Sequence, residues 1–275
     1  MDAPIVTLTT DWGDRDFFAA MVKGRLCSTI AGVRVVDISH QQCWNDPATT
    51  IAIIRHGCTA FPAGTVHIVD VGCERQSAEG HGTTGIVIPL LVAWRGQYII
   101  SSDRKLMEQA IEDECDGIVE LPLPEGVQSF SFLALDLYCG VAARLLAGED
   151  MHTFGQPCEP LRRRLRPGAQ MEGNMLTAMV TGIDSYGNAN LNLTYDEFST
   201  LRAGRRFRVK IERRVGISDR YEDITEVRRH YSDVRMGNIL LTVSVTGQLQ
   251  IAINKGSAAQ LLGLGYASKC SFLFE

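Results

Sequence analysis

The chain has 275 residues, 45% of them hydrophobic, so it is long enough to bury a substantial core in one large domain or two smaller ones, and we do not expect disorder. Charged residues make up 21% of the chain and are mixed in sign, with a formal net charge of -5, which argues against nucleic acid as a partner. The eight cysteines show no C-x-x-C pair and no repeated spacing, which indicates free thiols rather than zinc ligands or disulfides.

The amino terminus lacks a basic stretch followed by an apolar run, so we expect no signal peptide and no membrane anchor. The longest apolar run, residues 85–94, is too short to span a bilayer as a helix and contains Pro89, which favours a buried strand. We therefore expect a cytoplasmic protein with no membrane partner.

The first half alternates short β-branched runs with helical patterns, as in an α/β domain built on a largely parallel sheet. Strands are expected at residues 5–9, 33–39, 65–71, 85–94 and 98–101. Helices are expected at residues 17–30, 48–59, 106–112 and 135–146. Three of the strands run into polar residues, namely Thr10 with Asp11, Ser39 with His40, and Asp70. Because ligands bind at the carboxyl edge of such sheets, these residues mark the predicted site.

The composition changes near residue 154, where prolines and an arginine cluster occur without an apolar period. This change predicts an α/β domain at 1–155, a linker at 156–168 and a second domain at 169–275. Strand-like segments at 175–183, 206–212, 239–244 and 248–253 follow, separated by glycine turns. They predict a smaller antiparallel β-barrel domain.

The strongest local motif is Thr9-Thr10-Asp11-Trp12-Gly13-Asp14-Arg15-Asp16, between a strand and a helix. Asp14 and Asp16 are explained by helix capping, since carboxylates accept unpaired backbone N–H groups and complement the helix dipole. Asp11 comes earlier, at the end of the strand, where a carboxylate could take both hydroxyls of a ribose.

A second strand runs into Asp70, followed by a glycine turn and Arg75. The two side chains could form a salt bridge that only shapes the turn. They could equally be a polar pair that positions a small nucleophile. The sequence leaves both interpretations open.

Two motifs in the second half are compatible with a purely structural role. The turn 182–188 contains Asp184, Gly187 and Asn188, which turns favour without any function. Residues 249–259 predict a strand, a glycine turn and a short helix, whose backbone amides could bind a base or a carboxylate. The histidines show no metal-ligand spacing, so we expect no metal, and no nucleotide phosphate-binding motif occurs.

The order of these motifs resembles the S-adenosylmethionine (SAM) hydroxide adenosyltransferase family, which also contains fluorinase and chlorinase enzymes. The segments that carry the resemblance are LTTDWGDRDFFAAMVKG, VRVVDISH, FPAGTVHIVDVG, VTGIDSYGNANLNLT and TGQLQIAINKGSAAQLLG. The resemblance implies an α/β domain, a carboxy-terminal β-barrel domain and a homotrimer that binds SAM between subunits. SAM would be the substrate, with no cofactor.

The resemblance also implies roles for individual side chains. Asp11 would bind the ribose hydroxyls, and Trp44 would lie over the ligand if one residue is deleted after His40. Asp184 with Ser185 would hold the methionine ammonium group, and Thr246 would meet the methionine carboxylate. The adenine side would be formed by Tyr186, Asn188 and Asn254. Asp70 and Arg75 would be catalytic and would orient a water molecule.

The sequence departs from the family pattern at two places. Leu133 stands where the family's hydrolases have a histidine, and Asp103-Arg104-Lys105 replaces an Asp-Asn-Gly turn. His81 or His40 could supply an imidazole instead.

The preferred interpretation is a divergent SAM hydrolase that forms adenosine and methionine. The sulfonium leaving group is already cationic, so catalysis reduces to holding a nucleophile in line with the ribose carbon. The alternative is a non-catalytic SAM- or adenosine-binding protein. A halogenase is less favoured, because a halide site needs small hydroxyl or amide donors in a dry pocket, whereas the polar loop with Asp70 and Arg75 favours water.

Overall fold

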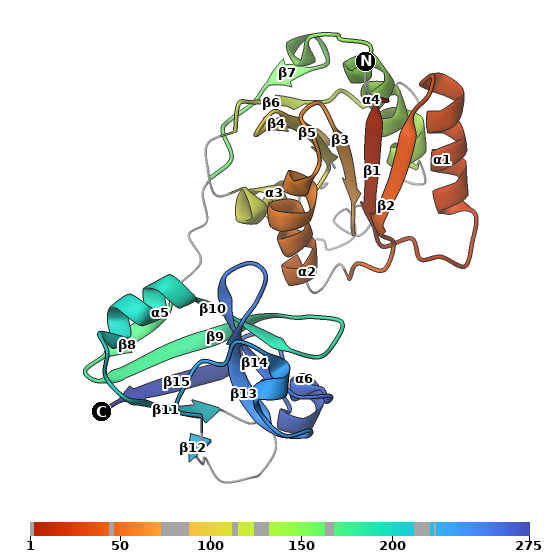
Figure 1. Cartoon of the computed structure of the whole chain (residues 1–275). Helices are drawn as coiled ribbons and strands as arrows, with labels where there is room; N and C mark the ends of the chain where they lie inside the picture. Colours follow the sequence, from red (N-terminus) through yellow and green to blue (C-terminus); the bar gives the residue numbers. More distant parts are fainter. Residues whose placement is uncertain are drawn as a thin grey trace, which may run out of the picture. The chain divides into compact units, whose positions relative to one another are not determined.

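The computed structural model describes residues 3–43, 47–72, 88–111, 115–123, 132–162, 168–211, 221–222 and 224–275. The chain divides into two compact units, Met1–Leu165 and Arg166–Glu275 (Figure 1). Each unit has its own sheet and buries its own hydrophobic residues, as separate domains do.

The sheet of the first unit has seven strands in the order β2-β1-β3-β5-β4-β6-β7. Their bounds are β1 Ile5–Thr10, β2 Arg34–Ser39, β3 Val66–Asp70, β4 Leu90–Trp94, β5 Gln97–Ser101, β6 Gly117–Glu120 and β7 Gln156–Pro157. The pairs from β2 through β1 and β3 to β5 are parallel, whereas β4, β6 and β7 join in antiparallel fashion. The predicted α/β class is confirmed, and antiparallel strands extend one edge of its parallel part.

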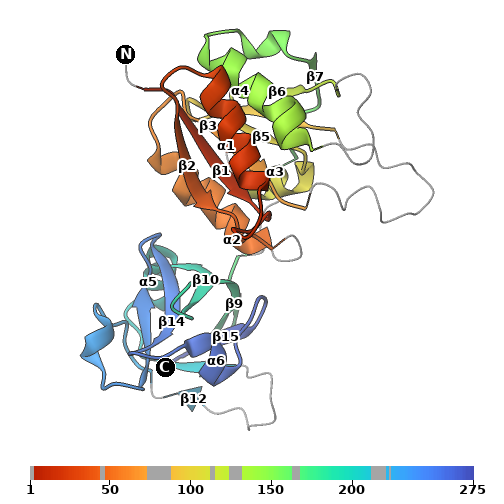
Figure 2. The same cartoon turned by 90° about the vertical axis from the view of Figure 1, so that its right-hand side faces the viewer.

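Helices cover both faces of this sheet (Figure 2). Their bounds are α1 Phe18–Thr29, α2 Pro47–Ala52 with its continuations Ile53–Gly57 and Cys58–Ala60, α3 Arg104–Ala110, the turn Ala134–Tyr138 that leads into α4 Cys139–Leu146, and the short turn Met151–Thr153. One core joins α1 and α4 to β1 and β3, and a second joins α2 and α3 to β3, β4 and β5. The interior strand β3 is buried on both faces, which explains why Val66, Ile68 and Val69 are apolar; His67 is the one polar residue before Asp70.

The structure corrects the expected linker at 156–168. Gln156 and Pro157 form β7, which pairs with β6, and Cys158 and Leu161 pack against a core of the first unit. The guanidinium of Arg104 also donates to backbone carbonyls of this segment. Residues 156–162 therefore belong to the first unit, because strand pairing and side-chain contacts outweigh a loop-like composition. Residues 163–167 lie outside the described part of the chain.

The second unit is an antiparallel sheet in the order β12-β11-β15-β9-β10-β14-β13, with β8 paired to β9. Its strands are β8 Gln170–Glu172, β9 Met175–Ile183, β10 Ala189–Thr194, β11 Phe207–Ile211, β12 Tyr221–Glu222, β13 Ile239–Val243, β14 Gln248–Ile253 and β15 Lys269–Phe274. Its helices are α5 Tyr195–Arg202, α6 Ala258–Leu262 and the turn Tyr231–Asp233. The strands curl around one aromatic-rich core, so the predicted second domain is confirmed as a curled half-barrel.

Within the part of the chain that the structure describes, none of the helices combines the length and the apolar character needed to cross a membrane.

Candidate active site

Polar residues gather at the carboxyl edge of the parallel strands in the first unit. Thr10 of β1 pairs with Asp70 of β3, and Thr9 pairs with Ser39 of β2, so the three strands end side by side. Asp11 and His40 follow directly after their strands. This edge is the place where α/β sheets bind ligands, and two candidate residues of the first domain, Asp11 and Asp70, lie there.

Asp70 is held by the indole of Trp12. The Trp12 Nε1 donates to Asp70 Oδ2 at 3.0 Å, and only 7% of Asp70 is exposed. The indole itself lies between the His40 ring, stacked at 5.9 Å, and the Phe132 ring, edge-on at 5.0 Å. Sequence reasoning missed this role of Trp12, since the contact joins residues 58 positions apart.

Asp11 is exposed and is oriented by the backbone of the β3 end. Its Oδ2 accepts a hydrogen bond from the Gly72 N–H at 2.8 Å, which links the two acid-bearing strand ends. Asp16 accepts from the Phe18 N–H at 3.2 Å at the start of α1, in agreement with the capping interpretation. Asp14 instead accepts from the Gln41 side chain at 2.9 Å. Asp11 is thus distinct from its two acidic neighbours.

His40 contacts Thr10, at the end of β1 directly before Asp11. Its Nδ1 lies 2.7 Å from Thr10 Oγ1, and its Nε2 lies 3.2 Å from Asp37 Oδ1. Burial raises the pKa of Asp37, but its contacts with Lys23 and His40 outweigh burial, so the pKa is lowered overall. Both ring nitrogens of the buried His40 thus face side chains of this loop cluster, which makes it a structural support.

The structure describes Leu133 and the turn Asp103-Arg104-Lys105, where the resemblance leads us to expect departures from the family pattern. Leu133 is partly buried against the core beside α1 and α4. Asp103 caps α3 by accepting from the Leu106 N–H at 2.9 Å. Arg104 lies 3.4 Å from Glu108 and donates to the carbonyls of Glu159 and Pro160. The Arg104 charge is therefore committed to holding the 156–162 segment.

Trp44, Arg75 and His81 lie outside the described residues. Among the residues that the structure does describe, no group of three or more His, Cys, Asp or Glu side chains could hold a metal ion.

In the second unit, Asp184 organises its own turn. Its Oδ1 accepts from the backbone N–H groups of Tyr186 and Asn188, both at 2.9 Å. Its Oδ2 accepts from Asn188 Nδ2 at 2.9 Å and from Gln250 Nε2 at 3.1 Å. A carboxylate has about four lone-pair positions, so these four bonds occupy the group that sequence reasoning assigned to an ammonium ion.

The same turn is clamped onto the segment before α6. Gly187 has a φ of +82°, and an added Cβ would lie 2.0 Å from Ser257 Oγ. The Ala259 N–H donates to the Gly187 carbonyl at 2.9 Å. Only glycine meets both demands, because a side chain would be strained by the backbone and would collide with Ser257.

A pocket of about 640 Å³ lies beside this turn. Its lining residues are Tyr186, Asn188, Tyr231, Ile253, Asn254, Lys255 and Gly256. All three residues expected on the adenine side therefore line one pocket. Tyr231 is an addition that sequence reasoning missed, because nothing around it forms a motif.

Ser185 and Thr246 lie outside this lining. Ser185 is exposed on the Asp184 turn. Thr246 is in the hairpin between β13 and β14, where its hydroxyl lies 2.8 Å from Ser244 Oγ. All of β14, Gln248–Ile253, separates Thr246 from Asn254 along the chain.

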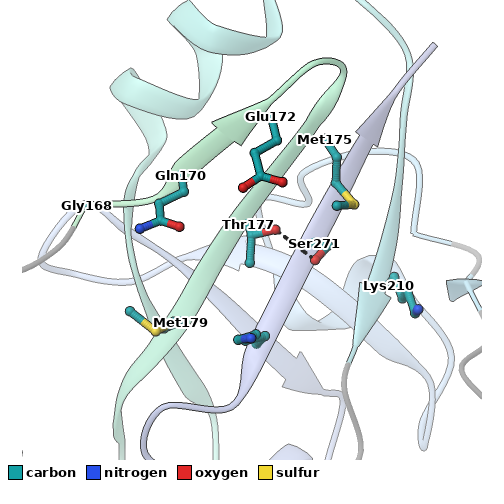
Figure 3. A pocket seen from close by; sticks show the side chains of 9 residues that line it. Gly168, Gln170, Glu172, Met175, Thr177, Met179, Lys210 and Ser271 are labelled. Atoms are coloured by element: carbon teal, nitrogen blue, oxygen red, sulfur yellow. Dashed lines mark hydrogen bonds between the residues drawn. The ribbon is translucent and has the colours of Figure 1, made fainter.

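A second hollow of about 390 Å³ lies over β8, β9, β11 and β15 (Figure 3). It is lined by Gly168, Gln170, Glu172, Met175, Thr177, Met179, Lys210, Lys269 and Ser271. The Thr177 and Ser271 hydroxyls hydrogen-bond to each other at 3.1 Å on its floor. Of the expected site residues that the structure describes, none lines this hollow.

Comparison with protein families agrees with this division of the chain. The SAM hydroxide adenosyltransferase N-terminal domain matches residues 6–155, and the C-terminal domain of the same family matches residues 178–271. The chain therefore belongs to the SAM hydroxide adenosyltransferase family.

Similar proteins carry a more specific name. The chain is 30% identical to the (R)-S-adenosyl-L-methionine hydrolase of Salinispora tropica, over 95% of this chain and 94% of that protein. It is 24% identical to the protein of the same name from Methanocaldococcus jannaschii, over 98% and 96%. The structure of an uncharacterized conserved protein from Thermotoga maritima has a TM-score of 0.76 at 22% identity, and covers 98% of this chain and 99% of that chain.

Proposed function

We propose that this protein hydrolyses SAM to adenosine and methionine. The observation that carries the proposal is the buried Asp70 carboxylate, held by Trp12 beside Asp11 at the carboxyl edge of the sheet. The family membership and the hydrolase names of the relatives support the same activity.

The proposed reaction is an in-line displacement. The oxygen of a water molecule forms a bond to the ribose 5′-carbon as the bond from that carbon to sulfur breaks. The electron pair of the broken bond goes to sulfur, so the sulfonium becomes the neutral thioether of methionine and needs no general acid. The attacking water loses one proton, which Asp70 is placed to accept or to pass to solvent.

The other residues have binding roles in this proposal. Asp11, fixed by the Gly72 N–H, would accept hydrogen bonds from the ribose hydroxyls. Tyr186, Asn188 and Asn254 would surround the adenine in the pocket of the second unit. Asp184 would shape that binding turn, with the ammonium role left to groups around it. Arg75 and Trp44 keep the roles that the resemblance implies.

A non-catalytic SAM- or adenosine-binding protein is the second candidate, and Leu133 is the observation that favours it. Leu133 packs against the core and offers no group to polarise a water molecule. The added cation Arg104 no longer favours this candidate, because it is engaged by Glu108 and two backbone carbonyls.

The test is to incubate the purified protein with SAM and to follow adenosine and methionine by chromatography. Asp70→Asn keeps an acceptor for Trp12 but removes the charge, so we expect kcat/KM to fall at least about 100-fold. Asp14→Asn is the matched control in the same loop, and it should stay within about twofold of the unchanged protein.

Two results would contradict the hydrolase, and a third would contradict only the role of Asp70. Saturable SAM binding without any product would establish the binding protein instead. Full activity in Asp70→Asn would remove the proposed base. Halogenated adenosine formed only with added halide would identify a halogenase. The homotrimer with sites between subunits and the cytoplasmic location remain predictions.

A further inference from the structure

The pocket beside the Asp184 turn is lined by polar groups whose hydrogen-bonding roles are set by contacts inside the protein. Its polar side chains include Asn188, Tyr231 and Asn254, each of which can in principle donate and accept. Whether a ligand meets a donor or an acceptor depends on which of these groups are already used inside the protein.

Gln250 decides the polarity of Tyr231. It is 3% exposed, and its Nε2 donates to Asp184 Oδ2 at 3.1 Å and to Asn190 Oδ1 at 3.0 Å. Asp184 can only accept here, so the amide nitrogen must face it and the amide oxygen must face the other way. That oxygen lies 2.9 Å from Tyr231 Oη, and the Tyr231 hydroxyl therefore donates to it.

Tyr231 keeps this proton over the whole neutral range. Burial and the nearby Asp184 charge raise the pKa of its hydroxyl above the ordinary value. With its single hydrogen pointing at Gln250, the hydroxyl has only lone pairs left for a ligand.

The two asparagines also offer acceptors to the pocket, although each Nδ2 keeps a second hydrogen, unlike the Tyr231 hydroxyl. Asn188 Nδ2 donates to Asp184 Oδ2 at 2.9 Å, and Asn254 Nδ2 donates to the Val234 carbonyl at 2.8 Å. Each partner is an obligate acceptor, so the amide orientation is set in both cases. Neither Oδ1 accepts a hydrogen bond from the residues that the structure describes, and both are left as acceptors for a ligand.

We propose that Gln250 is a positioning residue: it holds the Tyr231 hydroxyl so that this hydroxyl can only accept a hydrogen bond from a ligand. The pocket therefore selects a purine nucleoside that carries an exocyclic amino group over one that lacks it. The inference rests on the proposed function in taking a nucleoside as the ligand of this pocket. It adds a residue outside the pocket lining and a physical reason for the selectivity.

The test uses two nucleosides that differ only at this group, adenosine and purine riboside, with the full chain and no turnover. Calorimetry should show adenosine binding at least about tenfold more tightly, which corresponds to one hydrogen bond that the second ligand cannot make. Gln250→Met leaves the Tyr231 hydroxyl free to turn and donate, so purine riboside should gain relative to adenosine and the ratio should fall to about threefold or less.

Two further variants keep the result interpretable. Tyr231→Phe, at a side chain that is 45% exposed, should lose adenosine affinity and leave purine riboside unchanged. Gln97→Met is the matched control, because Gln97 is also a 3% exposed, hydrogen-bonded glutamine but lies in the first unit. It should leave the ratio unchanged.

An unchanged ratio in Gln250→Met and Tyr231→Phe would overturn the proposal, as would the lack of saturable binding of either nucleoside. A purely structural role of Gln250 would weaken both ligands equally and is excluded by a change in the ratio. Because no SAM is used, a failure of SAM hydrolysis and a failure of this inference give different results.

Discussion

His67 lies fully buried on β3, between Thr7 of β1 and Gln97 of β5. Gln97 uses its amide nitrogen on backbone carbonyls, so its oxygen accepts from His67 Nε2 at 3.3 Å. The other ring nitrogen then accepts from the Thr7 hydroxyl at 2.7 Å. The imidazole is therefore neutral, and burial lowers its pKa from 6.5 to about 4 despite the contact with Gln97.

The buried, neutral imidazole of His67 should make the stability of the protein sensitive to acid. His67 binds a proton near pH 6.5 in the unfolded chain but only near pH 4 in the folded chain. The neutral imidazole therefore costs no stability above pH 6.5, and the folded state loses stability as the pH falls from 6.5 toward 4. Between neutral pH and about pH 4.5, the free energy of unfolding measured in urea should fall by about 2 to 3 kcal/mol less in His67→Gln than in the unchanged protein. Equal losses in both proteins would show that His67 is not the group responsible.

Among the structural elements, the Asp184 turn requires glycine at position 187 for two reasons, a positive φ and the close approach of Ser257. Most glycines with positive φ have open space around them, so a side chain there meets only backbone strain. At Gly187 the close approach of Ser257 adds a collision. The turn and the start of α6 are thus fixed against each other, which keeps Asn188 and the segment from Asn254 to Gly256 in one pocket wall.

Gly187→Ala should therefore destabilise the protein more than a glycine replacement of equal backbone strain. Gly204, with a φ of +76° and nothing within 4 Å of an added Cβ, is the matched position. We expect Gly204→Ala to lower the free energy of unfolding by about 1 kcal/mol and Gly187→Ala by about 2 to 4 kcal/mol. Chemical denaturation measures both, and equal effects would mean that Ser257 moves away without cost.

At the scale of the whole molecule, the expected site residues are divided between the two units. Asp11 and Asp70 belong to the first unit, whereas Tyr186, Asn188 and Asn254 belong to the second. Several large apolar side chains of the chain are exposed, among them Phe17, Met236 and Val245. Exposed apolar side chains are one feature of surfaces that pair with another chain, and the trimer that the family resemblance implies remains a prediction.

Light scattering of the purified chain should accordingly give a mass three times that of one subunit. The trimer should persist on dilution to the concentrations of the activity assay, since the site would be incomplete without it. A monomer that still turns over SAM would contradict the assembly without contradicting the hydrolase.

The sequence by itself determined the alternation of strands and helices in the first half, the antiparallel strands of the second half and the acids at the strand ends. These features depend on local periodicity and on strand termini, which neighbouring residues encode. Only the tertiary structure decided that residues 156–162 belong to the first unit, that Trp12 holds Asp70, and that Gln250 connects Asp184 with Tyr231. Those contacts join residues 58, 66 and 19 positions apart, or pair short strands whose composition resembles a loop. No local pattern reports which distant donor meets which acceptor, because packing alone brings them together.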